Sequence, residues 1–213
     1  MRAVIIGATG LTGSELLRRL LLDPEFEEVV SVSRKPSLEP SGKLSEIRFS
    51  TLDELPGLRA KLQGDVYFCC LGTTIKTAGS KENFRKVDEK AVLDFARIAK
   101  AHEARAFVVV SAAGADRASA IFYSKVKGEV EEELKGLGFK RLCILRPSLL
   151  IGERKEHRSF EALFIKAFKT VAPVLPEKLR KLSGTEVGTL AQKMVDLAKV
   201  RREELVVLDA KEI

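Results

Sequence analysis

A glycine turn near the N-terminus, Gly7-Ala-Thr-Gly10-Leu-Thr-Gly13, constrains the fold more than any other stretch. An apolar run, Ala3-Val-Ile-Ile6, precedes it, and a run with helical character, Leu16 to Leu22, follows. Gly7 can adopt the backbone angles of a sharp turn, Gly10 lets backbone approach a pyrophosphate, and Gly13 lets a helix pack closely on a strand. The amides at the start of that helix then face the phosphates. The sequence predicts a strand, a phosphate-binding turn and a helix.

The position of this turn favours dinucleotide binding over the alternative, a plain loop between a strand and a helix. The strand and the helix lie where a dinucleotide-binding fold needs them, which is the context test for a glycine motif of this kind. We therefore expect cofactor contacts from residues of the turn, namely Gly7, Thr9, Gly10, Leu11, Thr12 and Gly13.

Segments typical of strands and of helices alternate along the chain. Strands are expected at residues 3–6, 28–33, 46–49, 65–71, 106–111, 141–145 and 205–208. Helices are expected to about residue 22 after the turn, and near 52–62, 82–102, 118–137, 159–170 and 186–200. This alternation predicts an α/β fold, a doubly wound parallel sheet (Rossmann fold) with helices on both faces.

The length limits the number of domains. At 213 residues and 23.5 kDa, one NAD(P)-binding domain over residues 1–213 is the simplest organisation. Within it we expect a cofactor-binding core, 1–150, and a small helical substrate-side extension, 151–213, that is not a separate domain. Ligands of such sheets bind at the carboxyl ends of the strands.

Composition excludes several classes of function. The net charge is +7 and the pI about 9.3, but basic residues alternate with acidic ones, so we expect attraction to anionic ligands and no specific nucleic-acid binding.

No apolar run approaches the ~20 residues of a membrane span. Because the N-terminus enters a strand directly, with no leader, we expect a cytoplasmic protein. The three cysteines lack the spaced pairs of a disulfide framework or a metal site, and no metal is expected.

The end of the second predicted strand indicates which cofactor is preferred. NAD-binding folds usually place an acid there, on the ribose 2′-hydroxyl. This chain has Ser33-Arg34-Lys35 instead. Arg34 can hold a 2′-phosphate with its planar fork, Lys35 can add a charge, and Ser33 can donate a hydrogen bond. The sequence favours NADP(H) over NAD(H); the alternative is that the two cations simply open a solvated loop.

A candidate acid-base group lies on the predicted helix 118–137. Tyr123 and Lys127 are four residues apart and so share a helix face, after a strand that ends in Ser111. Tyr123 can give a proton to a carbonyl oxygen as hydride arrives, and Ser111 can donate a hydrogen bond to that oxygen. Lys127 is expected to lower the pKa of Tyr123 and to bind the nicotinamide ribose. The other tyrosine, Tyr67, is expected in the core.

These motifs, with Arg146-Pro-Ser-Leu-Leu-Ile-Gly152, resemble the short-chain dehydrogenase/reductase superfamily, in particular its extended and atypical members. The segments 68–80, 111–116 and 123–129 are more similar to the Tat-interacting-protein oxidoreductase family and its small bacterial relatives. The resemblance covers nearly all of the chain to Gly152. It implies a Rossmann fold that binds NADPH and a catalytic triad of Ser111, Tyr123 and Lys127.

The resemblance also implies further cofactor contacts, from Leu71, Gly72 and Thr73 and from the backbone after Pro147, including Ser148. One position departs from the family pattern: many members have an Asn where this chain has Asp88, which places a proton relay through that position in doubt and leaves capping or orientation as its role.

Two functions of different class remain open. The first is an NADP-dependent oxidoreductase acting on a small carbonyl or alcohol, with a pocket built from residues 74–79, 112–121 and 152–160. The second is an NADPH-binding regulatory or redox-sensor protein that acts through protein partners. An epimerase of sugar nucleotides fits less well, because the C-terminal part is short. We expect either a monomer or a homodimer.

Overall fold

The computed structural model describes residues 1–36, 41–152 and 184–213. Its main sheet has seven parallel strands in the order β3-β2-β1-β4-β5-β6-β9. The strands are β1 (Arg2–Ile6), β2 (Glu28–Ser33), β3 (Leu44–Arg48), β4 (Val66–Cys69), β5 (Ala106–Val110), β6 (Arg141–Arg146) and β9 (Glu204–Asp209). This arrangement confirms the predicted doubly wound α/β fold.

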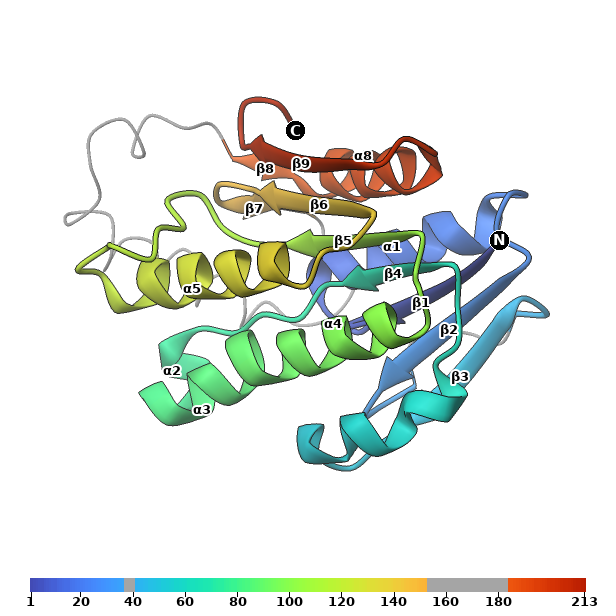
Figure 1. The fold of residues 1–213 in the computed structure, drawn as a ribbon, viewed down its shortest axis with the longest axis horizontal. Coiled ribbons are helices and arrows are strands. Elements are labelled where there is room, and N and C mark those ends of the chain that lie inside the picture. Colours follow the sequence, from blue (N-terminus) through green and yellow to red (C-terminus); the bar gives the residue numbers. More distant parts are fainter. Residues whose placement is uncertain (37–40, 153–183) are drawn as a thin grey trace.

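Helices cover both faces of the sheet (Figure 1). On one face, α1 (Leu11–Leu22) and α8 (Val187–Lys199) pack over side chains such as Ile5, Phe68 and Val108. On the other, α4 (Ala91–Ala101), α5 (Phe122–Gly136) and a 3-10 helix (Leu52–Lys61) cover the alternate residues of the same strands. Both faces of the central strands are buried, which explains their nearly continuous apolar runs.

Most predicted elements are confirmed, with boundaries shifted by a few residues. The predicted strand at 205–208 forms the edge strand β9, and the helix predicted near 186–200 is α8. The helix predicted at 159–170 lies outside the described residues. A two-stranded sheet of β7 (Leu150–Ile151) and β8 (Thr185–Glu186) was not predicted. No helix in the described ranges is long and apolar enough to cross a bilayer.

The segment predicted as one helix, 82–102, is built differently. It contains α3 (Lys81–Arg85), a π-helical turn (Lys86–Lys90) and α4. Before it, a short helix, α2 (Ile75–Ala78), begins at Thr74, whose hydroxyl accepts a hydrogen bond from the Thr77 amide. Such π-turns insert an extra residue into a helix and are frequent at functional sites.

The three thiols are unpaired. Cys69 and Cys143 are buried in the sheet, and Cys70 follows β4. Burial raises the pKa of Cys69 to about 12 and that of Cys143 to about 11. These thiols therefore stay protonated at neutral pH and act as packing groups.

Candidate functional site

The glycine turn after β1 has the geometry of a phosphate cradle. Gly7 has a φ of +85°, and a Cβ there would lie 2.6 Å from the carbonyl group of Cys70. A Cβ on Gly13 would lie 2.1 Å from the carbonyl oxygen of Gly7. The Gly10 amide closes the turn by donating to that same oxygen at 3.0 Å. Only glycine fits at positions 7 and 13, and the backbone at the start of α1 is left open to a ligand.

A cleft of about 380 Å³ lies beside the end of β2. Arg34 lines it together with Lys86 and Lys90 of the π-turn, while Asp53 comes from the 3-10 helix and Thr73 from the loop after β4. Lys90 is paired with Asp53 and Asp94. Arg34 and Lys86 are therefore the cations that favour an anionic group in this space, which is open to solvent. Lys86 and Lys90 were not singled out from the sequence.

The three residues at the end of β2 have different roles. Arg34 and Lys35 are exposed. The Ser33 side chain is buried, and its hydroxyl donates to the carbonyl oxygen of Lys35. The single hydrogen of Ser33 therefore holds the turn, so its predicted donation to a phosphate requires a different rotamer.

The loop after β4 connects the cradle with the acid-base group. Cys70 and Leu71 lie against Gly7. Two residues farther, the Thr73 amide donates to Oδ2 of Asp88 at 2.9 Å, and a Cβ on Gly72 would lie 3.8 Å from Oδ1 of Asp88. The predicted cofactor-lining segment 71–73 therefore bridges the glycine turn and the π-turn.

Asp88 forms a buried ion pair with Lys127. The distance from Lys127 Nζ to Asp88 Oδ1 is 2.7 Å, and the two side chains are 6% and 0% exposed. Lys127 lies one helical turn after Tyr123 on the same face of α5. The Tyr123 ring packs on Phe84 of α3, with ring centroids 5.6 Å apart. The structure therefore brings Tyr123 and Lys127 together as predicted, and adds Asp88.

Lys127 lowers the pKa of Tyr123 as expected, but the net shift of that pKa is upward. Burial raises the pKa of Tyr123 above its usual value of 10; Lys127 lowers it and Asp88 raises it. Desolvation disfavours the charged tyrosinate, and the carboxylate beside Lys127 offsets the attraction of the ammonium group. Burial depresses the pKa of Lys127, but Asp88, Tyr123 and Cys69 together raise it above its usual value, so the ammonium stays charged.

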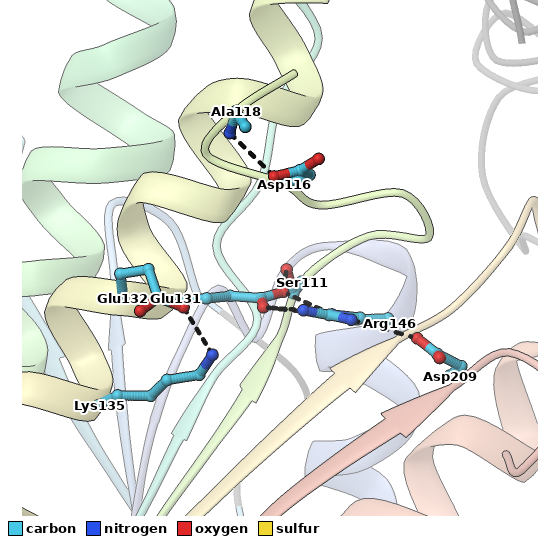
Figure 2. Close-up of polar contacts among 8 residues, drawn as sticks. All are labelled: Ser111, Asp116, Ala118, Glu131, Glu132, Lys135, Arg146 and Asp209. Atoms are coloured by element: carbon cyan, nitrogen blue, oxygen red, sulfur yellow. Dashed lines mark hydrogen bonds and ion pairs between the residues drawn. The ribbon is translucent and has the colours of Figure 1, made fainter.

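Ser111 belongs to a second polar network at the carboxyl ends of β5, β6 and β9 (Figure 2). Its hydroxyl donates to Oε1 of Glu131 at 2.5 Å. Glu131, 2% exposed, is also held by two nitrogens of Arg146, with the shortest contact 2.5 Å. Arg146 reaches Asp209 at 3.5 Å. The hydrogen that Ser111 was expected to give to a substrate is engaged with Glu131.

Ser111 and Lys127 nevertheless face the same small space. A buried gap of about 10 Å³ is lined by Asp88, Ser111, Lys127 and Glu131. Tyr123, Lys127 and Glu131 are spaced four residues apart on α5, so one helix face carries all three. This spacing was the signal in the sequence that pointed to Glu131, which sequence reasoning missed.

Gly128 determines how the loop after β5 lies on α5. A Cβ there would lie 2.2 Å from the Arg117 amide nitrogen. The Asp116 amide donates to the Ser124 carbonyl oxygen at 3.0 Å, and the Asp116 carboxylate accepts from the Ala118 amide at 2.8 Å (Figure 2). The sequence analysis did not single out Gly128. The feature that could have identified it is the presence of a glycine within a predicted helix.

The segment after β6 is also held in place. The carbonyl oxygen of Pro147 accepts from the Ala113 amide at 2.9 Å, and the Ser148 amide donates to the hydroxyl of Thr185 at 3.1 Å. These contacts join the end of β6 to β8. Residues 153–160 of the predicted substrate pocket, including His157, lie outside the described residues.

Comparison with known proteins supports a dinucleotide-binding protein. Residues 2–78 match the family "Semialdehyde dehydrogenase, NAD binding domain". Protein FMP52-1, mitochondrial, of Scheffersomyces stipitis is 39% identical over 157 residues, covering 73% of this chain and 70% of that protein. Protein HTATIP2 of Rattus norvegicus is 35% identical over 195 residues, covering 90% of this chain and 78% of that protein.

Solved structures show the same fold. A short-chain dehydrogenase family protein from Francisella tularensis has a TM-score of 0.72 at 12% identity, with 99% of this chain and 98% of that chain covered. MoeE5 in complex with UDP-glucose and NAD has a TM-score of 0.74 at 19% identity, with 98% of this chain and 75% of that chain covered. At these identities the likeness concerns the fold alone.

The expectation of a cytoplasmic protein is wrong by this comparison. The fungal FMP52 relatives are named as mitochondrial proteins. The expectation rested on the lack of an apolar leader, a feature of secretion that says nothing about import into mitochondria.

The identity to FMP52-1 and HTATIP2 extends over more than two thirds of each chain. The glycine turn and the parallel seven-stranded sheet agree with it. The chain therefore belongs to the family of HTATIP2-like and FMP52-like proteins, which are similar to short-chain dehydrogenases/reductases and are built on an NAD(P)-binding Rossmann domain.

Proposed function

We propose that this protein is an NADP(H)-dependent oxidoreductase that transfers hydride between the nicotinamide and a small carbonyl or alcohol substrate. Tyr123 acts as the general acid and base. The observation that carries the proposal is the continuous chain of contacts from the glycine turn through the segment 70–73 to Asp88 and then to Lys127. These contacts support a single site that includes the glycine turn and the helix face of Tyr123 and Lys127.

The choice of NADP(H) rests on the positive charge at the end of β2. Arg34 lines the same cleft as Lys86 and Lys90. Arginine offers two parallel donors to a phosphate, and Lys86 adds positive charge. An acid that would bind a ribose 2′-hydroxyl is missing from positions 33–35. These features support binding of the 2′-phosphate.

Each residue of the acid-base group has a task at a defined atom. The cofactor, when bound, supplies or accepts the hydride. The hydroxyl of Tyr123 donates its proton to the oxygen of the substrate carbonyl; in the reverse direction its tyrosinate removes the proton of the alcohol. Lys127 Nζ is buried beside Asp88, which holds its charge in place. Ser111 gives its hydrogen to Glu131, so a hydrogen bond from Ser111 to the substrate oxygen requires its hydroxyl to turn away from that carboxylate.

A binding titration followed by a turnover assay tests the proposal. NADPH at saturating concentration is expected to raise the thermal midpoint of the protein more than NADH does. Oxidation of NADPH is then followed with a panel of aldehydes and ketones. Tyr123→Phe should lower turnover about 10²- to 10⁴-fold while leaving NADPH affinity unchanged. Binding of NADPH without turnover of any carbonyl would favour the regulatory alternative.

A further inference from the structure

The ion pair between Asp88 and Lys127 raises a question of charge. A lysine beside a tyrosine normally favours the tyrosinate, so it prepares a base. Here the ammonium lies 2.7 Å from a carboxylate that has no solvent exposure. Two opposite charges at this separation act on a third group mainly as a dipole, because their separate effects largely cancel.

The position of Asp88 is fixed from two directions. Its Oδ2 accepts the hydrogen bond from the Thr73 amide, on the side of the cofactor loop. Its Oδ1 meets Lys127 on the side of α5. The π-helical turn Lys86–Lys90 has Asp88 at its centre, and Asp88 is its one buried residue. The carboxylate is therefore built into the fold between the two halves of the site.

We propose that Asp88 is a positioning residue: it neutralises the charge of Lys127 and thereby keeps Tyr123 protonated, as a proton donor for carbonyl reduction. This inference rests on the proposed function, in which Tyr123 is the acid-base group. Burial is the largest cause of the raised pKa of Tyr123, and Asp88 acts in the same direction, against Lys127. Replacement of Asp88 by a neutral residue would leave Tyr123 as the partner of Lys127, because the tyrosinate of Tyr123 also raises the pKa of Lys127, and the two ions would then stabilise each other.

Most other ionisable groups around this pair are paired or neutral. On the side of β4, Cys69 has a pKa of about 12 and is an uncharged thiol. On α3, Lys81 and Arg85 lie over the ring of Phe122. Three further sets of charges are paired: Arg85 with Glu89 and Glu129, Lys125 with Glu129, and Glu131 with Arg146. Besides burial, Lys127 and Asp88 are the groups that shift the pKa of Tyr123.

The amino-acid composition provides a direct assay that needs neither cofactor nor substrate. The chain has two tyrosines and no tryptophan. Tyr67 is fully buried, donates to the Leu62 carbonyl oxygen, and has a pKa raised by burial. The near-ultraviolet absorbance of tyrosinate in the folded protein therefore reports on Tyr123. Loss of this absorbance change in Tyr123→Phe would assign it to Tyr123.

The decisive variant is Asp88→Asn. It keeps the size of the side chain and an oxygen for the Thr73 amide, but removes the charge. The pKa of Tyr123 is expected to fall by about one to three units. One equivalent of tyrosinate should then appear below the pH at which wild type shows any, while circular dichroism stays native. Asp94→Asn, which removes a carboxylate paired with Lys90 and Arg97, is the matched control and should titrate as wild type.

A double variant keeps the test decisive if Asp88→Asn does not fold, because it leaves no unpaired buried charge. In Asp88→Asn/Lys127→Met, both charges are gone, and Tyr123 is expected to titrate within about half a unit of wild type if the pair is neutral as a unit. A pKa well above the wild-type value would show that Lys127 acts unmasked and would overturn the inference. So would a folded Asp88→Asn protein without the downward shift. Neither titration depends on NADPH binding. Failure of this inference can therefore be told apart from failure of the proposed function, which the cofactor and turnover assays test.

Discussion

The hydroxyl of Ser111 donates its hydrogen to Glu131, and the two oxygens are 2.5 Å apart. A carboxylate held by Arg146 can only accept hydrogen bonds, so the hydrogen of Ser111 is engaged and its lone pairs are what it can offer to another group. The carboxyl ends of β5 and β6 are joined through this one carboxylate on α5 (Figure 2). Glu131 therefore orders Ser111 and holds two strands and a helix together.

Removal of this carboxylate should destabilise the protein. Glu131→Leu leaves Arg146 and Ser111 without their partner, and we expect a loss of about 3 kcal/mol in the free energy of unfolding, measured with urea. Glu132→Gln is the control, since Glu132 is about half exposed and pairs with Lys135 at the surface. It should change stability by less than about 0.5 kcal/mol. Equal effects of the two substitutions would show that the network contributes nothing.

Two glycines on α5 give a paired prediction about packing. A Cβ on Gly128 would lie 2.2 Å from the Arg117 amide, whereas one on Gly136 meets no atom within 4 Å. Gly128→Ala should therefore displace the loop after β5 and cost about 1–3 kcal/mol. Gly136→Ala should stabilise the protein by about 0.5–1 kcal/mol, because alanine has less conformational freedom in the unfolded chain. Urea unfolding of both variants measures this, and a tolerated Gly128→Ala would contradict the close approach.

The sequence was sufficient to predict the sheet, the glycine turn and the shared face of Tyr123 and Lys127. Each of these depends on local pattern: apolar runs with period two, glycine spacing, and a separation of four residues on a helix. The alternation of strands and helices then fixed the parallel topology through the handedness of the connections.

The electrostatics of the site were not predictable in the same way. Asp88 contacts Lys127 because a π-turn lies inside a stretch whose apolar periodicity indicates one regular helix. Ser111 and Glu131 lie on different elements, and the direction of their hydrogen bond depends on Arg146 from a third. The upward sign of the net Tyr123 pKa shift follows from burial and from Asp88, neither of which the Tyr-Lys spacing contains; the spacing indicated only the lowering effect of Lys127.

The proposed preference for NADP(H) leads to a prediction about Arg34. Arg34→Ala should weaken NADPH binding about 10- to 100-fold, because a hydrogen-bonded charge contact is worth about 1.5–3 kcal/mol. NADH, which has no 2′-phosphate, should bind with nearly unchanged affinity. Fluorescence titrations of both cofactors measure this. Arg18→Ala, which removes an exposed arginine paired with Glu15 on α1, is the control. Equal losses for NADPH and NADH would mean that Arg34 contacts a part shared by both cofactors.

Because the thiols are buried, we expect the free energy of unfolding to fall at alkaline pH. Below pH 8 the thiols are protonated in both states, so they contribute no pH dependence. Above about pH 8.5 the thiols of the unfolded chain ionise, whereas Cys69 and Cys143 keep their protons in the fold up to about pH 12 and 11. The unfolded state then binds fewer protons, so the free energy of unfolding should fall by about 1.4 kcal/mol per pH unit for each thiol. Urea unfolding between pH 7 and 10.5 measures the slope.

A pair of strand variants separates this effect from packing. Cys143→Ala removes one thiol and should lessen the slope between pH 9 and 10.5 by about 1.4 kcal/mol per pH unit, despite a lower stability at pH 7. Ile144→Val, at the neighbouring fully buried position of β6, also leaves a small cavity but keeps all three thiols. Its slope should equal that of wild type, because a cavity has no proton to lose. If Cys143→Ala retained the wild-type slope, the Cys143 thiol would have to ionise equally in the folded and unfolded states.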